Sequence, residues 1–292
     1  MKKFVILGCE NSHADMFLGF LRDDDRYSDA ECIGVYSHDA EAAKKLADTF
    51  GVPVLNSYDE AVGKVDGVIV TARHGDNHYK YAAPYIKSGV PMFIDKPVTI
   101  DEDEAISFMR ECRDAGVRVT GGSSLVHNEW VAELCADRVG ELDGKTLGGF
   151  VRAPLSMSSP NGGFFFYAEH LVGVVCAIFG YYPKSVRTFV SGEKITVVFR
   201  YEDYDVTGLF TDNNYSCYYA MRTSETHVKG AEFPITGDSP CFRLEFDEFY
   251  SLLSGGQQRR TYDDFIAPVF VMNAINRSMT EDKEIEIRRF SV

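Results

Sequence analysis

The sequence predicts a doubly wound α/β domain followed by an α+β domain built on an open, largely antiparallel sheet. Three observations lead to this prediction. Short apolar runs alternate with helical stretches over the first 120 residues, as in βαβ units. These runs are apolar throughout, which is typical of parallel strands covered on both faces. After residue 121 the runs become rich in Val, Thr, Tyr and Phe, and turn residues separate them.

The elements expected before residue 121 follow from this alternation. Apolar residues near helical spacing fill the segments between the strands. The boundary at Gly121-Gly122 is abrupt, so we expect an N-terminal domain of residues 1–121 and a second domain of residues 122–292. The predicted strands are 4–7, 32–36, 67–70, 91–94 and 117–120. The predicted helices are 14–21, 40–50, 58–62, 79–88 and 101–115.

The second half is predicted to be β-rich, with helices at each end. Its predicted strands are 145–155, 185–190, 195–201, 205–211 and 217–226. Its predicted helices are 128–139, 167–179, 244–253 and 263–279. An open sheet face rich in Val, Phe and Tyr favours association with another copy, so we expect a homo-oligomer, a dimer or a tetramer.

Composition excludes several classes of partner and site. The net charge of −14 disfavours nucleic acid and anionic membranes, because phosphate-binding faces need clustered Lys and Arg. No apolar window is long enough to cross a bilayer. The seven cysteines lie far apart and form no C-x-x-C pair, so they are expected to be reduced thiols of a cytoplasmic protein. No metal site is predicted.

The most informative stretch is Phe93-Ile94-Asp95-Lys96-Pro97, an apolar run that ends in an acidic-Lys-Pro triplet. Parallel sheets place their chemistry at the carboxyl ends of the strands. Pro97 fixes its own φ and biases Lys96 toward extended geometry. The triplet therefore predicts a functional ammonium group at a strand tip, although an ordinary solvated lysine gives the same local pattern.

The first strand runs into a turn that departs from the dinucleotide-binding fingerprint. That fingerprint has three glycines, and this chain reads Gly8-Cys9-Glu10-Asn11-Ser12-His13. Glu10 replaces the second glycine, which adds bulk and a charge like that of the pyrophosphate. The helix N-terminus still favours an anion, and Asn11, Ser12 and His13 can donate hydrogen bonds. We predict cofactor contacts from this turn, with a lost or remodelled cofactor site as the alternative.

The second strand lacks the acid that holds the ribose 2′-hydroxyl of NAD. Its place is taken by Ser37, which His38 follows. A small hydroxyl beside a potential cation tolerates a 2′-phosphate, so these two predicted cofactor residues favour NADP. The nearby Asp39 keeps NAD open.

Together these features resemble the Gfo/Idh/MocA oxidoreductases, the glucose-fructose oxidoreductase and inositol dehydrogenase family. The resemblance covers essentially the whole chain. It rests on Asp95-Lys96-Pro97, where the family has Glu-Lys-Pro, and on the segments 43–47, 50–53, 68–71, 139–145 and 167–170. It implies an N-terminal Rossmann domain and a C-terminal open-sheet domain. It also implies hydride transfer between NAD or NADP and a sugar, inositol or related polyol.

The resemblance also implies site residues. The family's catalytic lysine corresponds to Lys96 and its histidine to His170, with Tyr167 beside it as a substrate residue. The family usually has an aspartate four residues before that histidine, where this chain has Phe166. Glu169 lies about 100° away around a helix and replaces it poorly.

The loop after the third strand supplies the remaining candidates. Thr71 ends that strand, and His74 and His78 follow it. With Asp95, they are predicted to lie near the cofactor, His78 as part of a helix start. Lys96 and His170 favour an enzyme, whereas Glu10, His13 and Phe166 favour a non-catalytic ligand-binding or regulatory protein of the same fold.

Overall fold

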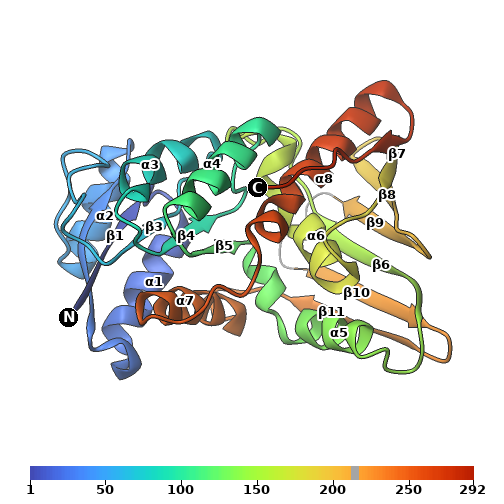
Figure 1. Cartoon of the computed structure of the whole chain (residues 1–292), viewed down its shortest axis with the longest axis horizontal. Helices are drawn as coiled ribbons and strands as arrows, with labels where there is room; N and C mark the ends of the chain where they lie inside the picture. The colour runs from blue at the N-terminus through green and yellow to red at the C-terminus, as the bar shows by residue number, and fades with distance from the viewer. Residues whose placement is uncertain (212–216) are drawn as a thin grey trace. The chain divides into compact units, whose positions relative to one another are not determined.

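The computed structural model describes residues 1–211 and 217–292. The chain divides into two compact units (Figure 1). Unit 1 contains Met1–Gly122, Phe242–Phe265 and Ser291–Val292, and unit 2 contains Ser123–Cys241 and Ile266–Phe290. The sequence suggested one boundary after residue 121 and assigned all later residues to the second domain. In the structure, residues 242–265 pack with the N-terminal unit.

Unit 1 is built on a five-stranded parallel sheet with the strand order β2-β1-β3-β4-β5. Residues Phe4 to Leu7 of β1 are fully buried, as expected for a strand covered on both faces. This topology is the predicted doubly wound Rossmann sheet, so the fold class is confirmed. The strands are β1 (Lys2–Leu7), β2 (Ala30–Tyr36), β3 (Gly67–Val70), β4 (Met92–Asp95) and β5 (Val119–Gly122).

Several helices of unit 1 begin at polar capping residues. Asn11, Asp39 and Asp101 each accept a hydrogen bond from a backbone N–H in the first turn of the helix that follows. The helices are α1 (Ser12–Asp23), η1 (Asp25–Tyr27), α2 (Ala40–Phe50), α3 (Asp76–Ile86) and α4 (Glu102–Asp114).

The predicted helix at 58–62 is wrong, because the structure has turns there. The run is too short to offset the cost of starting a helix. Its first carbonyl is instead satisfied by a side chain, since the Tyr85 hydroxyl donates to the carbonyl oxygen of Tyr58 at 2.8 Å.

Helix α7 (Pro240–Leu253) supplies aromatic side chains to the core of unit 1. The ring of Phe249 lies 5.7 Å from that of Phe4, and the ring of Phe246 lies 5.1 Å from that of Phe17. Tyr27 packs edge-on against Phe246 at 4.9 Å. This packing explains why residues 242–265 belong to unit 1.

Within the described residues, unit 2 contains a seven-stranded sheet with the order β11-β10-β6-β9-β8-β7-β12. The neighbours β6 and β9 run parallel, and the other pairs are antiparallel. The largely antiparallel sheet predicted for this half is confirmed. The strands are β6 (Thr146–Pro154), β7 (Ser185–Ser191), β8 (Lys194–Arg200), β9 (Asp205–Thr211), β10 (Cys217–Ser224), β11 (Val228–Pro234) and β12 (Ile285–Glu286).

Strands β11 and β12 were not predicted from the sequence. In β11, Lys229, Gly230 and Glu232 interrupt the apolar alternation. Strand β12 has only two residues, so it exists through its pairing with β7 rather than through a local pattern.

One face of this sheet is covered by helices. Helix α6 is buried almost all round and packs on β6 and β9, and α5 packs on β10 and β11 (Figure 1). None of the helices in the described ranges has the length and hydropathy of a bilayer span. The remaining helices are η2 (Ser124–His127), α5 (Glu129–Val139), α6 (Phe164–Phe179) and α8 (Tyr262–Glu281).

Candidate functional site

The turn after β1 is fixed by its close approach to the end of β3. Gly8 has a φ of 77°, and a Cβ built on it would lie 2.4 Å from the backbone nitrogen of Ala72. The Thr71 hydroxyl donates to the carbonyl oxygen of Gly8 at 3.1 Å. The first glycine of the fingerprint is therefore required by the fold, because any side chain there would meet backbone.

Glu10 turns its carboxylate toward the ends of β2 and β3, the two strands that flank β1. Its Oε2 accepts a hydrogen bond from the Ser37 hydroxyl at 2.6 Å, and its Oε1 accepts one from the backbone N–H of Arg73 at 3.1 Å. The Nδ1 atom of His38 lies 3.9 Å from the same Oε1 atom. The structure thus brings Glu10 to the adjacent residues Ser37 and His38, the first of which lies 27 residues later in the sequence.

Asn11 connects the start of α1 to the acidic residue of the triplet. Its Nδ2 donates to Oδ2 of Asp95 at 2.7 Å, and its Oδ1 accepts from the backbone N–H of His13. Asn11 and Asp95 are both buried, whereas Ser12, the first residue of α1, is exposed. The exposed Ser12 is thus the residue of this turn that is best placed to meet a ligand.

His13 lies between two buried carboxyl groups. Its Nδ1 is 3.0 Å from Oδ2 of Asp95, and its Nε2 is 3.4 Å from Oε2 of Glu245, which α7 contributes. Asp95 and Glu245 are fully buried. Sequence reasoning missed Glu245, because nothing local connects residue 245 to the first turn of the chain.

The protonation states of this cluster follow from burial and charge. Burial alone would lower the pKa of His13, but Asp95 and Glu245 raise it to about 9. Burial alone would raise the pKa of Asp95, but His13 holds it down at about 2. Burial raises the pKa of Glu245 to about 8 against the attraction of His13. Near neutral pH, the cluster therefore contains ionised Asp95, protonated His13 and neutral Glu245.

Lys96 directly follows β4 and is only 5% exposed. Its backbone N–H donates to Oδ1 of Asp95 at 2.7 Å, and its peptide bond to Pro97 is cis. Asp95 therefore holds the backbone of Lys96 with one oxygen while its other oxygen contacts Asn11 and His13. The acidic-Lys-Pro triplet is a fixed structure at the carboxyl end of the sheet.

His78 joins the loop after β3 to the loop after β4. Its Nδ1 lies 2.7 Å from the carbonyl oxygen of Pro97, and its Nε2 lies 2.7 Å from that of Ala72. Burial lowers the pKa of His78, and the nearby Asp95 opposes that effect. His78 and Thr71 both shape the loops through backbone contacts, whereas His74 is only half-buried and pairs with Asp76 at 3.6 Å.

The substrate candidates lie in unit 2, on and beside α6. The Nδ1 atom of His170 is 2.8 Å from the Ser123 hydroxyl oxygen, which also accepts from the backbone N–H of Leu125. Rings of Tyr167 and Tyr218 lie 5.7 and 6.2 Å from that of His170. Sequence reasoning missed Ser123, although its position just after Gly122 at a strand end was a usable signal.

The comparison with protein families identifies unit 1. Residues 2–123 match the family GFO_IDH_MocA, described as an oxidoreductase family with an NAD-binding Rossmann fold. This part of the chain is therefore similar to the Gfo/Idh/MocA oxidoreductases. The resemblance recognised in the sequence is thereby confirmed. A comparison with curated protein sequences found no significant match.

Solved structures of Gfo/Idh/MocA type share the fold of the whole chain. A myo-inositol dehydrogenase from Corynebacterium glutamicum ATCC 13032 has a TM-score of 0.82 at 13% identity, with 99% of this chain and 100% of that chain covered. GenD2 from gentamicin A biosynthesis, in complex with NAD, has a TM-score of 0.84 at 17% identity and coverages of 99% and 97%. The WlbA dehydrogenase from Bordetella pertussis, in complex with NADH and UDP-GlcNAcA, has a TM-score of 0.81 at 16% identity and coverages of 99% and 99%.

The residues at the carboxyl edge of unit 1 are compatible with a bound dinucleotide. Gly8 makes the tight turn that the fold needs, and the N-terminus of α1, an end of a helix that favours an anion, carries the exposed Ser12. The larger side chain of Glu10 is held in place by hydrogen bonds that Ser37 and Arg73 donate to its carboxylate. A bound nicotinamide would supply the hydride chemistry, and these residues would hold the phosphates and the ribose.

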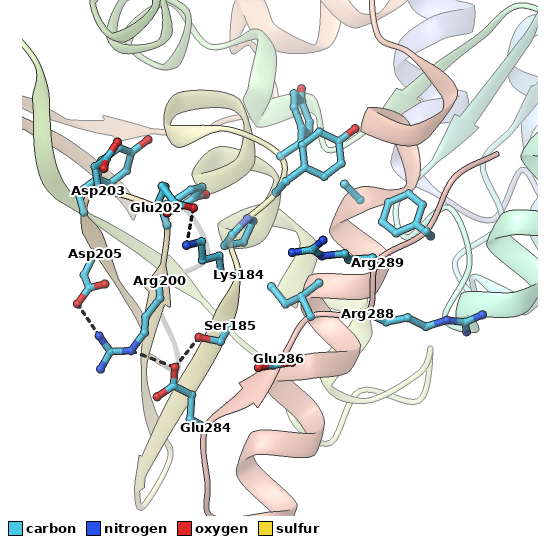
Figure 2. A pocket seen from close by; sticks show the side chains of 18 of the residues that line it. Lys184, Ser185, Arg200, Glu202, Asp203, Asp205, Glu284, Glu286, Arg288 and Arg289 are labelled. Carbon is cyan, nitrogen blue, oxygen red and sulfur yellow. Dashed lines mark hydrogen bonds and ion pairs between the residues drawn. The ribbon is translucent and has the colours of Figure 1, made fainter.

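Unit 2 also contains a cavity of 1620 Å³ that includes none of the predicted site residues. It lies between the start of β7, the β8–β9 turn and the C-terminal residues 284–290 (Figure 2). Some of its charges pair with each other: Arg200 contacts Asp205 and Glu284 at 3.1 Å each, and Lys184 pairs with Glu202. Charged residues of both signs line the rest of the cavity.

Proposed function

We propose that the protein is an NAD(P)-dependent oxidoreductase that transfers a hydride between nicotinamide and a sugar, inositol or related polyol. The observation that carries this proposal is the fixed Asp95-Lys96-Pro97 triplet within a unit of NAD-binding family type. Asn11 and His13 hold the carboxylate that orients the backbone of Lys96. A cluster that orients a lysine in this way is more typical of an enzyme than of a protein that only binds a ligand.

Oxidation of an alcohol needs a group that stabilises the developing alkoxide and a base that takes the hydroxyl proton. We assign the first role to the ammonium group of Lys96, since a nearby cation lowers the pKa of a hydroxyl. We assign the second to His170, because imidazole titrates near neutral pH. Bound nicotinamide supplies the hydride acceptor.

Ser123 supports the role given to His170. The Ser123 oxygen already accepts a hydrogen bond from Leu125, so it can also accept one from Nδ1–H of His170. A ring protonated at Nδ1 keeps a lone pair on Nε2, which is the atom that would receive the proton. Ser123 is thus proposed to fix the orientation and tautomer of His170.

The substrate class is proposed from the similar proteins and the residues around His170. The similar structures include an inositol dehydrogenase and a dehydrogenase bound to a nucleotide sugar. Tyr167 and Tyr218 place aromatic rings near His170, and aromatic rings suit the C–H faces of sugar rings. The seven cysteines are thiols rather than disulfides in the structure, which agrees with our proposal of a cytoplasmic location.

Two measurements test this proposal. Fluorescence titration should detect binding of NADH or NADPH, and a panel of inositols, sugars and nucleotide sugars should contain a substrate. Lys96→Ala and His170→Ala should each lower turnover by about 10²-fold or more, the usual scale for acid-base groups. Lys87→Ala and His227→Ala change exposed residues of the same two units and should leave turnover unchanged.

The outcomes separate the enzyme from the alternative. Full activity in Lys96→Ala would contradict the assigned mechanism. If neither dinucleotide binds the wild-type protein, the alternative of a non-catalytic ligand-binding or regulatory protein replaces the proposal. Phe166 is the observation that favours this alternative, because it stands where the family usually has an aspartate.

A further inference from the structure

We propose that Glu10 supplies the carboxylate that binds the adenosine ribose and selects NAD(H) over NADP(H). This inference rests on the proposed cofactor site and concerns the choice between two dinucleotides. The sequence favoured NADP because Ser37 stands where an acid would favour NAD. In the structure, the carboxylate of Glu10, which comes from a different part of the chain, lies beside Ser37.

Glu10 places its carboxylate at the end of β2. In dinucleotide-binding folds, the residue after the second strand hydrogen-bonds to the ribose 2′-hydroxyl. Ser37 directly follows Tyr36, the last residue of β2. The Oε2 atom of Glu10 lies 2.6 Å from the Ser37 hydroxyl oxygen, so the carboxylate sits at the ribose position although its residue belongs to the first turn.

The hydrogen-bond pattern requires that Glu10 accepts and Ser37 donates. The Ser37 oxygen accepts a hydrogen bond from the backbone N–H of Asp39 at 3.0 Å, and its one proton is directed at Glu10. The other carboxylate oxygen accepts from the backbone N–H of Arg73 at 3.1 Å. A carboxylate offers about four acceptor positions, so two remain for ribose hydroxyl groups.

The negative charge of Glu10 distinguishes the two cofactors. A ribose 2′-hydroxyl donates a proton to a carboxylate and gains a charge-assisted hydrogen bond. A 2′-phosphate has acceptor oxygens and negative charge, so Glu10 would repel it. The basic side chains beside Glu10 in the described residues, Arg73 and His38, are exposed, and water screens exposed charges. The balance at this position therefore favours the cofactor that lacks the phosphate.

The experiment measures dissociation constants for NADH and NADPH by fluorescence titration at fixed ionic strength. Wild type should bind NADH more tightly than NADPH. Glu10→Gln keeps the shape and removes the charge, and it should shift the NADPH-to-NADH ratio of dissociation constants by about tenfold or more toward NADPH. Glu31→Gln removes the same charge from an exposed position at the other end of β2, and it should leave the ratio unchanged.

An exchange variant tests whether the place of the carboxylate is what matters. Glu10→Ser combined with Ser37→Asp moves the acid to the end of β2 and should restore the preference for NADH that Glu10→Gln loses. Melting temperatures of all variants identify any that fail to fold. If the exchange variant fails to fold, Ser37→Ala is measured in its place, because this change removes the hydroxyl that donates to the Glu10 carboxylate. Ser37→Ala should weaken the preference in the same direction as Glu10→Gln.

The results distinguish the inference from the proposed function. A wild-type protein that binds neither dinucleotide overturns the proposed function. If the dinucleotides bind but NADPH is preferred, or the ratio is unaffected in Glu10→Gln, only the role of Glu10 is overturned. Equal tightening of both cofactors by Glu10→Gln would show that Glu10 obstructs the site, and this too would overturn the inference.

Discussion

At the scale of single residues, the substitutions in the glycine fingerprint are matched by partners elsewhere. Glu10 stands at the second glycine position and bonds to Ser37 and Arg73, and His13 stands at the third and contacts two carboxyl groups. Each replacement therefore has a defined environment. We therefore propose that the departures from the fingerprint remodel the turn, because each replacement is held by partners from other segments.

The buried His13 cluster predicts how stability depends on pH. The pKa of His13 is raised from 6.5 to about 9 and that of Glu245 from 4.5 to about 8. A group with a raised pKa stabilises the folded state below its unfolded value, and this stabilisation is lost as the pH rises through the folded value. Glu245 therefore predicts that unit 1 loses stability between pH 4.5 and about pH 8, and His13 predicts a further loss between pH 6.5 and about pH 9. Glu248 and Arg260 are the other groups whose charges act on Glu245.

Thermal unfolding at a series of pH values checks this prediction. Each kcal/mol lost should lower the melting temperature by about 2–4 °C. Glu245→Gln removes one of the two titrating groups, so the variant should lose less stability than wild type over the same range. Glu41→Gln, at an exposed position, should follow the wild-type curve. A flat wild-type profile from pH 6 to pH 9 would contradict the assigned protonation states.

At the scale of elements, helix α7 shows how a late segment completes an early core. Its aromatic residues pack against β1 and α1, although more than 200 residues separate them in the chain. Its Glu245 reaches His13, and its Glu248 accepts from the Thr120 hydroxyl of β5 at 2.7 Å. Unit 1 therefore depends on α7 for apolar contacts and for polar partners.

Removing one ring from α7 should destabilise unit 1. Phe249 is fully buried, and Phe249→Ala should lower the free energy of unfolding by about 3–5 kcal/mol through lost burial and a cavity. Leu244 lies on the same helix and is 46% exposed, so Leu244→Ala is a matched control with an expected loss below about 1 kcal/mol. Urea titration of both variants measures their free energies of unfolding. Equal losses of unfolding free energy in the two variants would show that α7 contributes little to the core.

At the scale of the whole molecule, the uncovered face of the unit 2 sheet is the candidate surface for self-association. Alternate residues of four neighbouring strands are half-buried on this face, while their neighbours in sequence are buried. Phe150 lies opposite Met221, and the rings of Phe150 and Tyr219 are 6.0 Å apart. We propose that a second copy of this chain covers this face.

Charges placed on this face should prevent the association. Met221→Glu and Leu209→Glu would each bury a charge if the face is an interface, so both should shift the protein toward monomer in sedimentation velocity. Val139→Glu adds the same charge at an exposed position at the end of α5 and should leave the assembly unchanged. A monomeric wild-type protein at micromolar concentration would contradict the expected homo-oligomer.

The sequence by itself determined the features that depend on neighbours within a few residues. The strand-helix alternation predicted the Rossmann sheet, and the Asp95-Lys96-Pro97 triplet predicted the position of the candidate lysine. Periodicity and turn chemistry are local, so they can be read without knowing which distant segments meet. The short pattern at 58–62 marks the limit of this reasoning, since a helix needs more than five favourable residues.

The tertiary structure alone decided which distant residues meet. It joined Glu10 to Ser37 and His13 to Glu245, and it placed α7 in unit 1. These contacts depend on strand order, on strand register and on the packing of helices against the sheet. They leave no periodic trace in the chain, because a side chain whose partner lies 27 residues away, as for Glu10 and Ser37, or much further, as for His13 and Glu245, is not constrained by its neighbours in sequence. The choice of cofactor that we propose depends on one of these long-range contacts.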